Sequence, residues 1–182
     1  MRAARRSPTW LHIGIDAAAE RMAETSRRAG RERLGNALFV RAAAESLPPE
    51  LAECATEVTV ILPWGSLLRI VAAPDAEALA GIRRVCRTGA SFRTVVACDP
   101  HRDARTWREL GLEPGGLDER TLAQGYAAAG FVLEGVRECT SKEFSALRTT
   151  WARRLARSPG RRAWTLTATA APSGGMRALG AK

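Results

Sequence analysis

The chain has 182 residues, 46% of them hydrophobic, which is enough to bury the core of one globular domain. It carries 28 Lys+Arg against 19 Asp+Glu, and nearly all the cations are arginines, whose planar donors suit phosphates and stack on bases. Four cysteines without a CxxC pair, and two histidines distant from them, argue against a zinc site, and the chain has no long apolar run. We therefore expect a soluble cytoplasmic protein that keeps its thiols reduced, crosses no membrane and binds a polyanion.

The basic residues gather toward the two ends of the sequence. Residues 1–33 hold eight basic and four acidic side chains, and residues 137–162 hold eight basic and two acidic ones. Between them, residues 34–136 hold ten basic and thirteen acidic side chains. This distribution predicts a nucleic-acid surface built from the ends of the chain, while the alternative is a genome that simply favours arginine on solvated faces.

Strand and helix patterns alternate along the chain. The first part predicts a strand at 10–16, a helix at 17–33, a strand at 37–40, a loop at 42–49 and a β-branched, buried strand at 57–62. The second part predicts helices at 65–72 and 75–86, a strand at 91–96, a helical turn near 105–110, a helix at 117–129, a strand at 131–139, a helix at 141–158 and a strand at 162–168.

Strands separated by helices predict a mostly parallel α/β sheet. One crossover helix, 117–129, precedes two strands that can pair antiparallel, 131–139 and 162–168, which is typical of Rossmann-like methyltransferases but also fits other doubly wound folds. We expect one domain over residues 1–169 and a disordered tail over residues 170–182, which are small residues, Pro and Gly.

Three motifs occur in order along the chain: Ala42-Ala-Ala-Glu-Ser-Leu-Pro48, Ile61-Leu-Pro-Trp-Gly-Ser66 and Thr150-Trp-Ala-Arg-Arg-Leu155. With them, the sequence from about Trp10 to Arg162 resembles the aminoglycoside-resistance 16S rRNA (adenine(1408)-N1)-methyltransferases of the kanamycin–apramycin resistance type. The resemblance implies a class I methyltransferase sheet with an antiparallel C-terminal strand. It also implies transfer of a methyl group from S-adenosylmethionine to N1 of adenine 1408 in the 30S subunit, which blocks aminoglycoside binding. We expect a monomer.

Asp16 ends the first predicted strand, where a carboxylate can accept both ribose hydroxyls of a nucleoside cofactor. Its alternative role is to cap the helix that follows. The resemblance implies that Ala44 and Glu45 flank the cofactor adenine, although this stretch could also be an ordinary loop with a capping Glu. The same resemblance assigns further residues to the cofactor pocket, namely Ile61, Ser66, Thr149, Thr150 and Trp151.

Two tryptophans are implied by the resemblance to hold the target base. Trp64, after Pro63, and Trp151 would clamp the adenine once it has left the helix stack. The pattern alone favours a core aromatic residue for Trp64 and the apolar face of a helix for Trp151. No general base is expected, because adenine N1 has a free lone pair that can attack the methyl group directly.

Eight arginines are implied to contact ribosomal RNA, through shape and phosphates rather than base sequence. Four of them lie near the end of the first long helix and four flank the second tryptophan motif: Arg27, Arg28, Arg31, Arg33, Arg153, Arg154, Arg161 and Arg162.

The resembling enzymes begin with a strand and a glycine-rich, GTGDG-like loop under the methionine part of the cofactor, and this sequence has no such motif. Residues 1–8 instead resemble the end of the helix that follows that loop, and the absent strand would lie between strands 10–16 and 57–62. We expect either a start codon assigned too far downstream or a true truncation, and weak or no S-adenosylmethionine binding by the chain alone. The alternative functions are an inactive RNA-binding remnant and a methyltransferase for another RNA.

Overall fold

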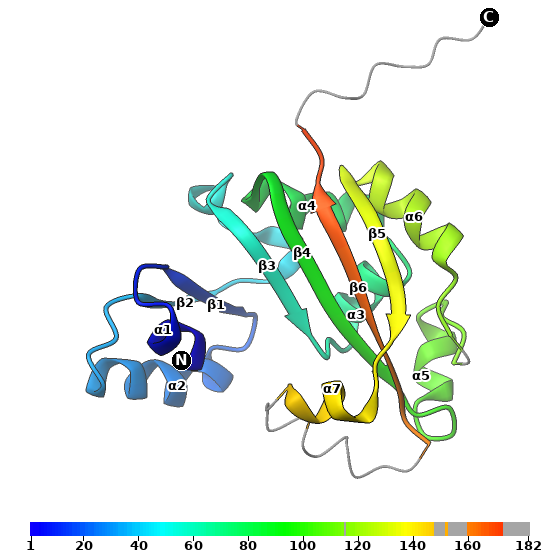
Figure 1. Ribbon diagram of the computed structural model, residues 1–182, viewed down its shortest axis with the longest axis horizontal. Helices are drawn as coiled ribbons and strands as arrows, with labels where there is room; N and C mark the ends of the chain where they lie inside the picture. Colours follow the sequence, from blue (N-terminus) through cyan, green and yellow to red (C-terminus); the bar gives the residue numbers. More distant parts are fainter. Residues whose placement is uncertain (115, 148–151, 153–159, 173–182) are drawn as a thin grey trace, which may run out of the picture. The chain divides into compact units, whose positions relative to one another are not determined.

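The computed structural model describes residues 1–114, 116–147, 152 and 160–172. The chain divides into two compact units, Met1–Pro49 and Glu50–Lys182 (Figure 1). The single domain expected over residues 1–169 therefore stays a prediction. Within the described ranges, no helix has the length and apolar character that crossing a membrane requires.

The first unit is a parallel strand pair with its crossover helix. Strand β1 (His12–Asp16) pairs with β2 (Ala37–Arg41), and helix α2 (Ala19–Arg31) connects them and contacts both. The short helix α1 (Arg2–Arg6) comes first, and two 3₁₀ turns follow β2, η1 (Ala44–Ser46) and η2 (Pro49–Leu51). The predicted strand–helix–strand order is confirmed.

β1 begins at His12 rather than at the expected Trp10, because the residues before His12 form hydrogen bonds with the Asn36 side chain instead of pairing with β2. The side-chain amide of Asn36 donates hydrogen bonds to the carbonyl oxygens of Ala4, Ser7 and Trp10, at 2.9, 3.2 and 3.0 Å. The backbone between α1 and β1 therefore wraps around one amide and enters the strand pairing only at His12.

The second unit contains a mixed four-stranded sheet in the order β3-β4-β6-β5, with bounds Ala55–Ile61, Cys86–Cys98, Arg162–Ala170 and Phe131–Glu138. β3 and β4 are parallel, and β6 runs antiparallel to both of its neighbours. The predicted antiparallel pairing of the last two strands is thus confirmed. β1 and β3 belong to different sheets.

Helices α3, α4 and α6 contact one another beside this sheet, with bounds Ser66–Ala72, Ala76–Val85 and Glu119–Ala128. An aromatic core lies beneath α6, where Phe92 packs against Tyr126 and Phe131 with ring centroids 5.9 and 5.2 Å apart. The hydroxyl of Tyr126 donates a hydrogen bond of 3.0 Å to the carbonyl of Val71, which joins α6 to α3. Gly125 is required here because a Cβ atom at this position would collide with Pro74.

Two shorter helices follow strand ends: α5 (Ala104–Glu109) after β4 and α7 (Ser141–Ala146) after β5. Thr140 and Glu143 form a capping box at the start of α7, in which each side chain bonds the backbone of the other residue. The predicted helix 141–158 is confirmed only in this first part, because residues 148–151 and 153–159 lie outside the described part of the chain.

Strands β4 and β6 extend beyond the ranges that the sequence pattern predicts by two residues or more at one end. β4 begins at Cys86 rather than Ser91, because Cys86 already pairs with Ala55 before an irregular stretch that contains Gly89 at φ 77°. β6 extends to Ala170, the residue assigned to the tail, since it still pairs with Phe131. The largely buried Arg83 then donates to the carbonyls of Gly130, Cys86 and Ala171, which holds the end of β6 in place.

Candidate functional site

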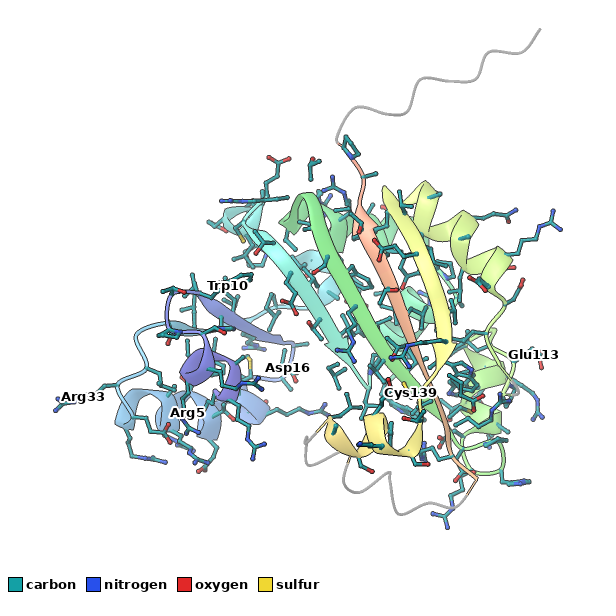
Figure 2. The ribbon with its side chains drawn as sticks, viewed as in Figure 1. Arg5, Trp10, Asp16, Arg33, Glu113 and Cys139 are labelled. Carbon is teal, nitrogen blue, oxygen red and sulfur yellow. The ribbon has the colours of Figure 1, made fainter. Side chains whose placement is uncertain are left out.

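In the first unit, Asp16 lies at the carboxyl end of β1 (Figure 2). Its Oδ1 atom accepts a hydrogen bond of 2.9 Å from the backbone amide of Ala18, and Ala18, not Asp16, is the N-cap residue of α2. The alternative role of Asp16 as the helix cap is therefore wrong. Among the described residues, none donates a hydrogen bond to Oδ2 of Asp16, so this oxygen can accept one from a ribose hydroxyl.

The loop after β2 starts beside Asp16. The amide of Ala42 donates a hydrogen bond of 3.2 Å to the carbonyl of Asp16, and because β1 and β2 are parallel, both strands end at the same edge. Ala44 and the exposed Glu45 follow in η1, which has no side-chain cap, so Glu45 is not a capping residue. A free carboxylate oxygen beside a small-residue loop at this edge fits the ribose and adenine of S-adenosylmethionine.

In the second unit, the end of β3 leads into a loop with an unusual backbone. Leu62 has φ 53° and Gly65 has φ 62°, and these two left-handed residues enclose Pro63 and Trp64. Pro63 is buried, whereas Trp64 is 48% exposed. The core-aromatic alternative for Trp64 is therefore wrong. Ser66 is exposed at the start of α3.

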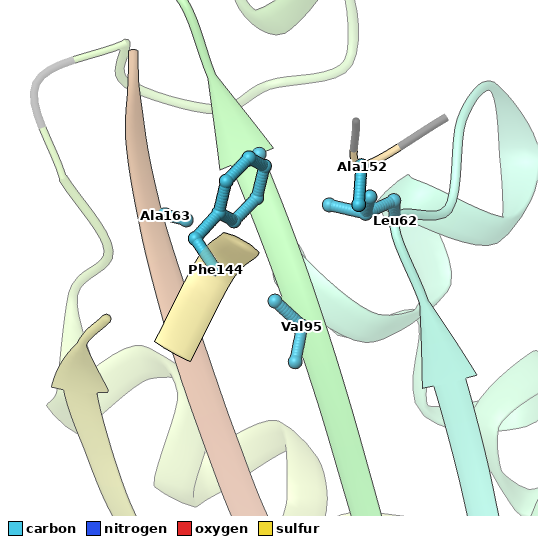
Figure 3. Close-up of a cluster of buried hydrophobic side chains, with 6 residues drawn as sticks. Leu62, Val95, Phe144, Ala152 and Ala163 are labelled. Carbon is cyan, nitrogen blue, oxygen red and sulfur yellow. The ribbon is translucent and has the colours of Figure 1, made fainter. Parts of the chain in front are cut away.

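Beneath this loop lies a cluster of buried apolar side chains (Figure 3). It contains Leu62, Val95, Ala97, Phe144, Ala152 and Ala163, and the partly buried Ile61 packs against it. Ala152 is only 1% exposed, although it follows Trp151 in the sequence. The predicted roles of Thr149, Thr150 and Trp151 concern residues that lie outside the described residues.

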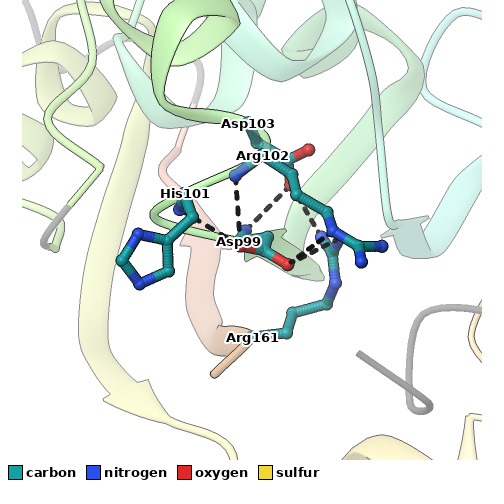
Figure 4. A network of polar contacts seen from close by, with 5 residues as sticks. All are labelled: Asp99, His101, Arg102, Asp103 and Arg161. Atoms are coloured by element: carbon teal, nitrogen blue, oxygen red, sulfur yellow. Dashed lines mark hydrogen bonds and ion pairs between the residues drawn. The ribbon is translucent and has the colours of Figure 1, made fainter. Parts of the chain in front are cut away.

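Arg161 has a different environment from the RNA surface that the sequence predicts. Its side chain is 9% exposed, and its Nη1 and Nη2 atoms lie 2.7 Å from Oδ2 of Asp103 and 3.9 Å from Oδ2 of Asp99 (Figure 4). Asp99 is buried as well, and its Oδ1 accepts the backbone amides of His101 and Arg102. Because the guanidinium of Arg161 is committed to two carboxylates, we assign it a structural role instead of RNA contact.

The other described arginines that the sequence assigns to RNA contact are accessible to solvent. Arg27, Arg28, Arg31 and Arg33 are exposed at or just after the end of α2. Glu32 pairs with Arg28 at 2.9 Å and with Arg5, and hydrogen bonds from Arg5 and then Arg28 lower the pKa of Glu32.

Arg162 forms two hydrogen bonds of 2.8 Å with Glu138, and its guanidinium lies 5.1 Å from the centre of the Trp164 ring. It remains partly exposed. Arg153 and Arg154 lie outside the described residues.

The comparisons with known proteins agree with the resemblance. The family described as NpmA: 16S rRNA (adenine(1408)-N(1))-methyltransferase matches residues 1–170. A 16S rRNA (adenine(1408)-N(1))-methyltransferase from Streptoalloteichus tenebrarius is 38% identical over 159 residues, which cover 84% of this chain and 72% of the relative. A protein of the same description from Escherichia coli is 30% identical, with 80% and 70% covered.

Solved structures are similar over most of the chain. The aminoglycoside resistance methyltransferase NpmB1 is 41% identical with a TM-score of 0.75, over 93% of this chain and 80% of that one. The 16S rRNA methyltransferase KamB is 36% identical with a TM-score of 0.79, over 94% and 81%. A mutant methyltransferase from Catenulisporales acidiphilia, solved with its cosubstrate SAM, is 29% identical with a TM-score of 0.78, over 95% and 80%. By its fold and by sequence, this chain belongs to the S-adenosylmethionine-dependent 16S rRNA (adenine(1408)-N(1))-methyltransferase family.

Proposed function

We propose that this chain transfers a methyl group from S-adenosylmethionine to N1 of adenine 1408 of 16S rRNA in the 30S subunit. Family membership supports this reaction. The observation that carries it is the exposed indole of Trp64 on a loop whose other side chains are partly or fully buried, directly after a parallel strand. An aromatic face presented to solvent at this place suits a base that has left its stack.

The cofactor supplies the electrophilic methyl group when it is bound. We assign the ribose hydroxyls to Asp16, whose Oδ2 atom is available, and the adenine to the adjoining Ala44 and Glu45. The resemblance also assigns cofactor binding to Ile61, Ser66, Thr149, Thr150 and Trp151.

The target adenine would be held between Trp64 and Trp151, with Pro63 shaping the loop beside it. Stacking of a flipped base on aromatic side chains contributes about 1–3 kcal/mol per base. The lone pair of adenine N1 attacks the methyl group without prior deprotonation, so the protein acts by positioning and by placing aromatic faces beside the developing positive charge.

Docking on the 30S subunit is assigned to exposed arginines near the ends of the chain. Arg27, Arg31 and Arg33 form no ion pair with other described residues, whereas Arg28 shares Glu32 with Arg5. The resemblance assigns RNA contact to Arg153, Arg154 and Arg162 as well. We also propose that the protein acts as a cytoplasmic monomer and that its product confers tolerance to kanamycin and apramycin.

The test is primer extension on 16S rRNA from cells that express the chain. Two forms are compared: the 182-residue chain, and an extended form in which the same chain is preceded by a strand–helix unit with the GTGDG-like loop that the resemblance implies. We expect the extended form to give a stop at adenine 1408 and raised kanamycin and apramycin tolerance. Trp64→Ala and Trp151→Ala should each abolish both effects, and a wild-type extended form without the stop would overturn the proposed function.

A further inference from the structure

In the first unit, one carboxylate holds two arginines from different helices beside each other. Glu32 accepts hydrogen bonds from Arg28 of α2 and from Arg5 of α1, which lies 27 residues earlier in the sequence. We propose that this Arg5–Glu32–Arg28 triad is a preformed site for a phosphate group of 16S rRNA, with Arg5 as an additional RNA contact and Glu32 as a positioning residue. The proposal rests on the proposed function for the identity of the RNA. It adds Arg5 and Glu32, to which the resemblance assigns no role.

The geometry of the triad leaves hydrogen-bond donors of both guanidinium groups available. Oε1 of Glu32 accepts a hydrogen bond of 2.9 Å from Nε of Arg28. Oε2 accepts one of 2.9 Å from Nε of Arg5 and another from its Nη2 atom. Among the described residues, none accepts a hydrogen bond from Nη1 of Arg5 or from the Nη atoms of Arg28. These N–H groups are the kind that bind phosphate oxygens in pairs, and two guanidinium groups on one carboxylate keep one positive charge in excess.

The exposure of the three side chains places the two arginines where an anion can reach them. The side chains of Arg5 and Arg28 are 41% and 57% exposed, whereas that of Glu32 is 30% exposed. Hydrogen bonds from Arg5 and then from Arg28 lower the pKa of Glu32, so its carboxylate stays charged and keeps both arginines bound. An approaching phosphate therefore meets the guanidinium groups, while the carboxylate is the most covered member of the triad.

The backbone at Glu32 is fixed by the way in which α2 ends. Glu32 is the C-cap residue, and the following Arg33 has φ 52°, the left-handed conformation for which glycine is usual at this place. The amide of Arg33 donates a hydrogen bond of 3.0 Å to the carbonyl of Gly30. The amide of Leu34 donates one of 3.0 Å to the carbonyl of Ala29. These two bonds form a Schellman motif, so the Glu32 side chain starts from a defined position at the helix end.

Helix α1 is anchored as well, and this anchor places Arg5. The side-chain amide of Asn36 donates hydrogen bonds to the carbonyls of Ala4 and Ser7, on either side of Arg5, at 2.9 and 3.2 Å. The Ala4 side chain is only 1% exposed. From this helix, Arg5 extends to the Glu32 carboxylate at the end of α2 (Figure 2). Because ordering one long side chain during binding lowers affinity by about twofold to tenfold, arginines that are already held should bind a phosphate more tightly than mobile ones.

The first experiment measures binding of the 182-residue chain to purified 30S subunits over a series of KCl concentrations. Glu32→Gln removes a negative charge, so a general attraction between a basic surface and RNA predicts tighter binding. A preformed phosphate site predicts the opposite, and we expect binding to weaken by about threefold to tenfold, because the RNA must then order both arginines. Glu24→Gln is the matched control, since Glu24 is exposed on the same helix and pairs with no cation among the described residues. This control should bind as tightly as wild type or more tightly.

The second experiment tests whether Arg5 itself contacts a phosphate. Arg5→Gln should weaken binding and lower the slope of log K against log salt by about 0.7–0.9, which corresponds to one phosphate contact. Arg6→Gln is the control, because Arg6 is the next residue of α1, is exposed and forms no ion pair with the described residues. We expect its salt slope to stay near that of wild type. All four variants should keep the wild-type Tm to within a few degrees, since exposed ion pairs contribute little to stability.

The outcomes separate this proposal from the proposed function. Unchanged or tighter binding in Glu32→Gln would overturn the positioning role of Glu32, and equal salt slopes in Arg5→Gln and Arg6→Gln would overturn the phosphate contact of Arg5. A wild-type chain that does not bind 30S subunits would overturn the triad as an RNA site. Binding that depends on Arg5 and Glu32 as expected, together with an extended form that leaves adenine 1408 unmethylated, would support the triad and refute the proposed function alone.

Discussion

Removal of Asp103 should destabilise the second unit strongly, because its carboxylate is the nearer partner of a buried guanidinium. In Asp103→Ala, Arg161 loses the oxygen at 2.7 Å and keeps, among the carboxylates of the described residues, Asp99 at 3.9 Å. The backbone amide of Asp99 also loses its acceptor, the same Asp103 oxygen at 2.8 Å. The substitution thus leaves the guanidinium of Arg161 without its nearer carboxylate and the backbone amide of Asp99 without its hydrogen-bond acceptor.

The magnitude follows from the burial of this pair. Removing one partner of a buried ion pair costs about 3–5 kcal/mol, and the remaining Asp99 carboxylate places Asp103→Ala near the lower end, at about 3 kcal/mol. For a protein of this size, 1 kcal/mol corresponds to about 2–4 °C in Tm, so we expect a fall of about 6–12 °C. Urea unfolding is measured by near-UV circular dichroism, since Trp107 and Trp164 pack 5.8 Å apart in this unit.

Glu109→Ala is the matched control, because Glu109 pairs with Arg105 at 2.8 Å on the same helix α5. Both side chains of that pair are exposed, and such pairs contribute about 0–1 kcal/mol. If Asp103→Ala lowered the free energy of unfolding no more than Glu109→Ala does, the reasoning from burial would be refuted. Arg161 would then return to the set of arginines proposed for RNA contact.

Two further predictions concern packing and pH. Gly125→Ala should lower Tm in calorimetry, although helix propensity alone would favour alanine by about 1 kcal/mol, because the added methyl group collides with the facing proline and overpacking costs about 1–3 kcal/mol. A Tm at or above wild type would contradict this packing. Hydrogen bonds from Arg137, and then from Thr140, lower the pKa of Glu143 to about 2, so the contribution of this carboxylate to stability is present above its ordinary value and is lost as pH falls toward 2. An NMR titration of Glu143 with a midpoint near 4.5 would contradict the expected shift, and Arg137→Ala should raise the midpoint.

The strand order of the second unit could be predicted in part from the sequence, because its hydrophobic runs are unambiguous. Helices α5 and α6 lie between β4 and β5, and the antiparallel pairing that the sequence predicts for the last two strands is the one that β5 and β6 form. The start of β4 could not be predicted, because the polar Arg87 and Thr88 and then Gly89 follow Cys86. The pairing of Cys86 with Ala55 depends on a register shift that no periodicity reveals.

The roles of charged residues were harder to predict than their positions. Arg161 and Arg162 are adjacent in the sequence, yet Arg161 is buried between two aspartates and Arg162 lies partly exposed between Glu138 and Trp164. A count of charges treats both as surface cations. The signal that could have separated them is the pair Asp99 and Asp103 just after a strand whose last five residues are buried, since carboxylates placed there need a cation.

The motif Ile61-Leu-Pro-Trp-Gly-Ser66 shows why resemblance identifies a site more readily than it explains one. Trp64 is easily recognised as a candidate because its aromatic ring can stack on a base, whereas the sequence gives Leu62 no feature that separates it from other core residues. The structure gives Leu62 a strained backbone and joins it to Ala152, the least conspicuous residue of the other motif. If methyl transfer requires a fixed placement of Trp64, then substitutions of the buried apolar residues beside it should lower the rate as substitutions of the tryptophan do. Leu62→Ala and Trp64→Ala should therefore both lower kcat, but only Leu62→Ala should also lower the free energy of unfolding, because Leu62 is buried and Trp64 is exposed.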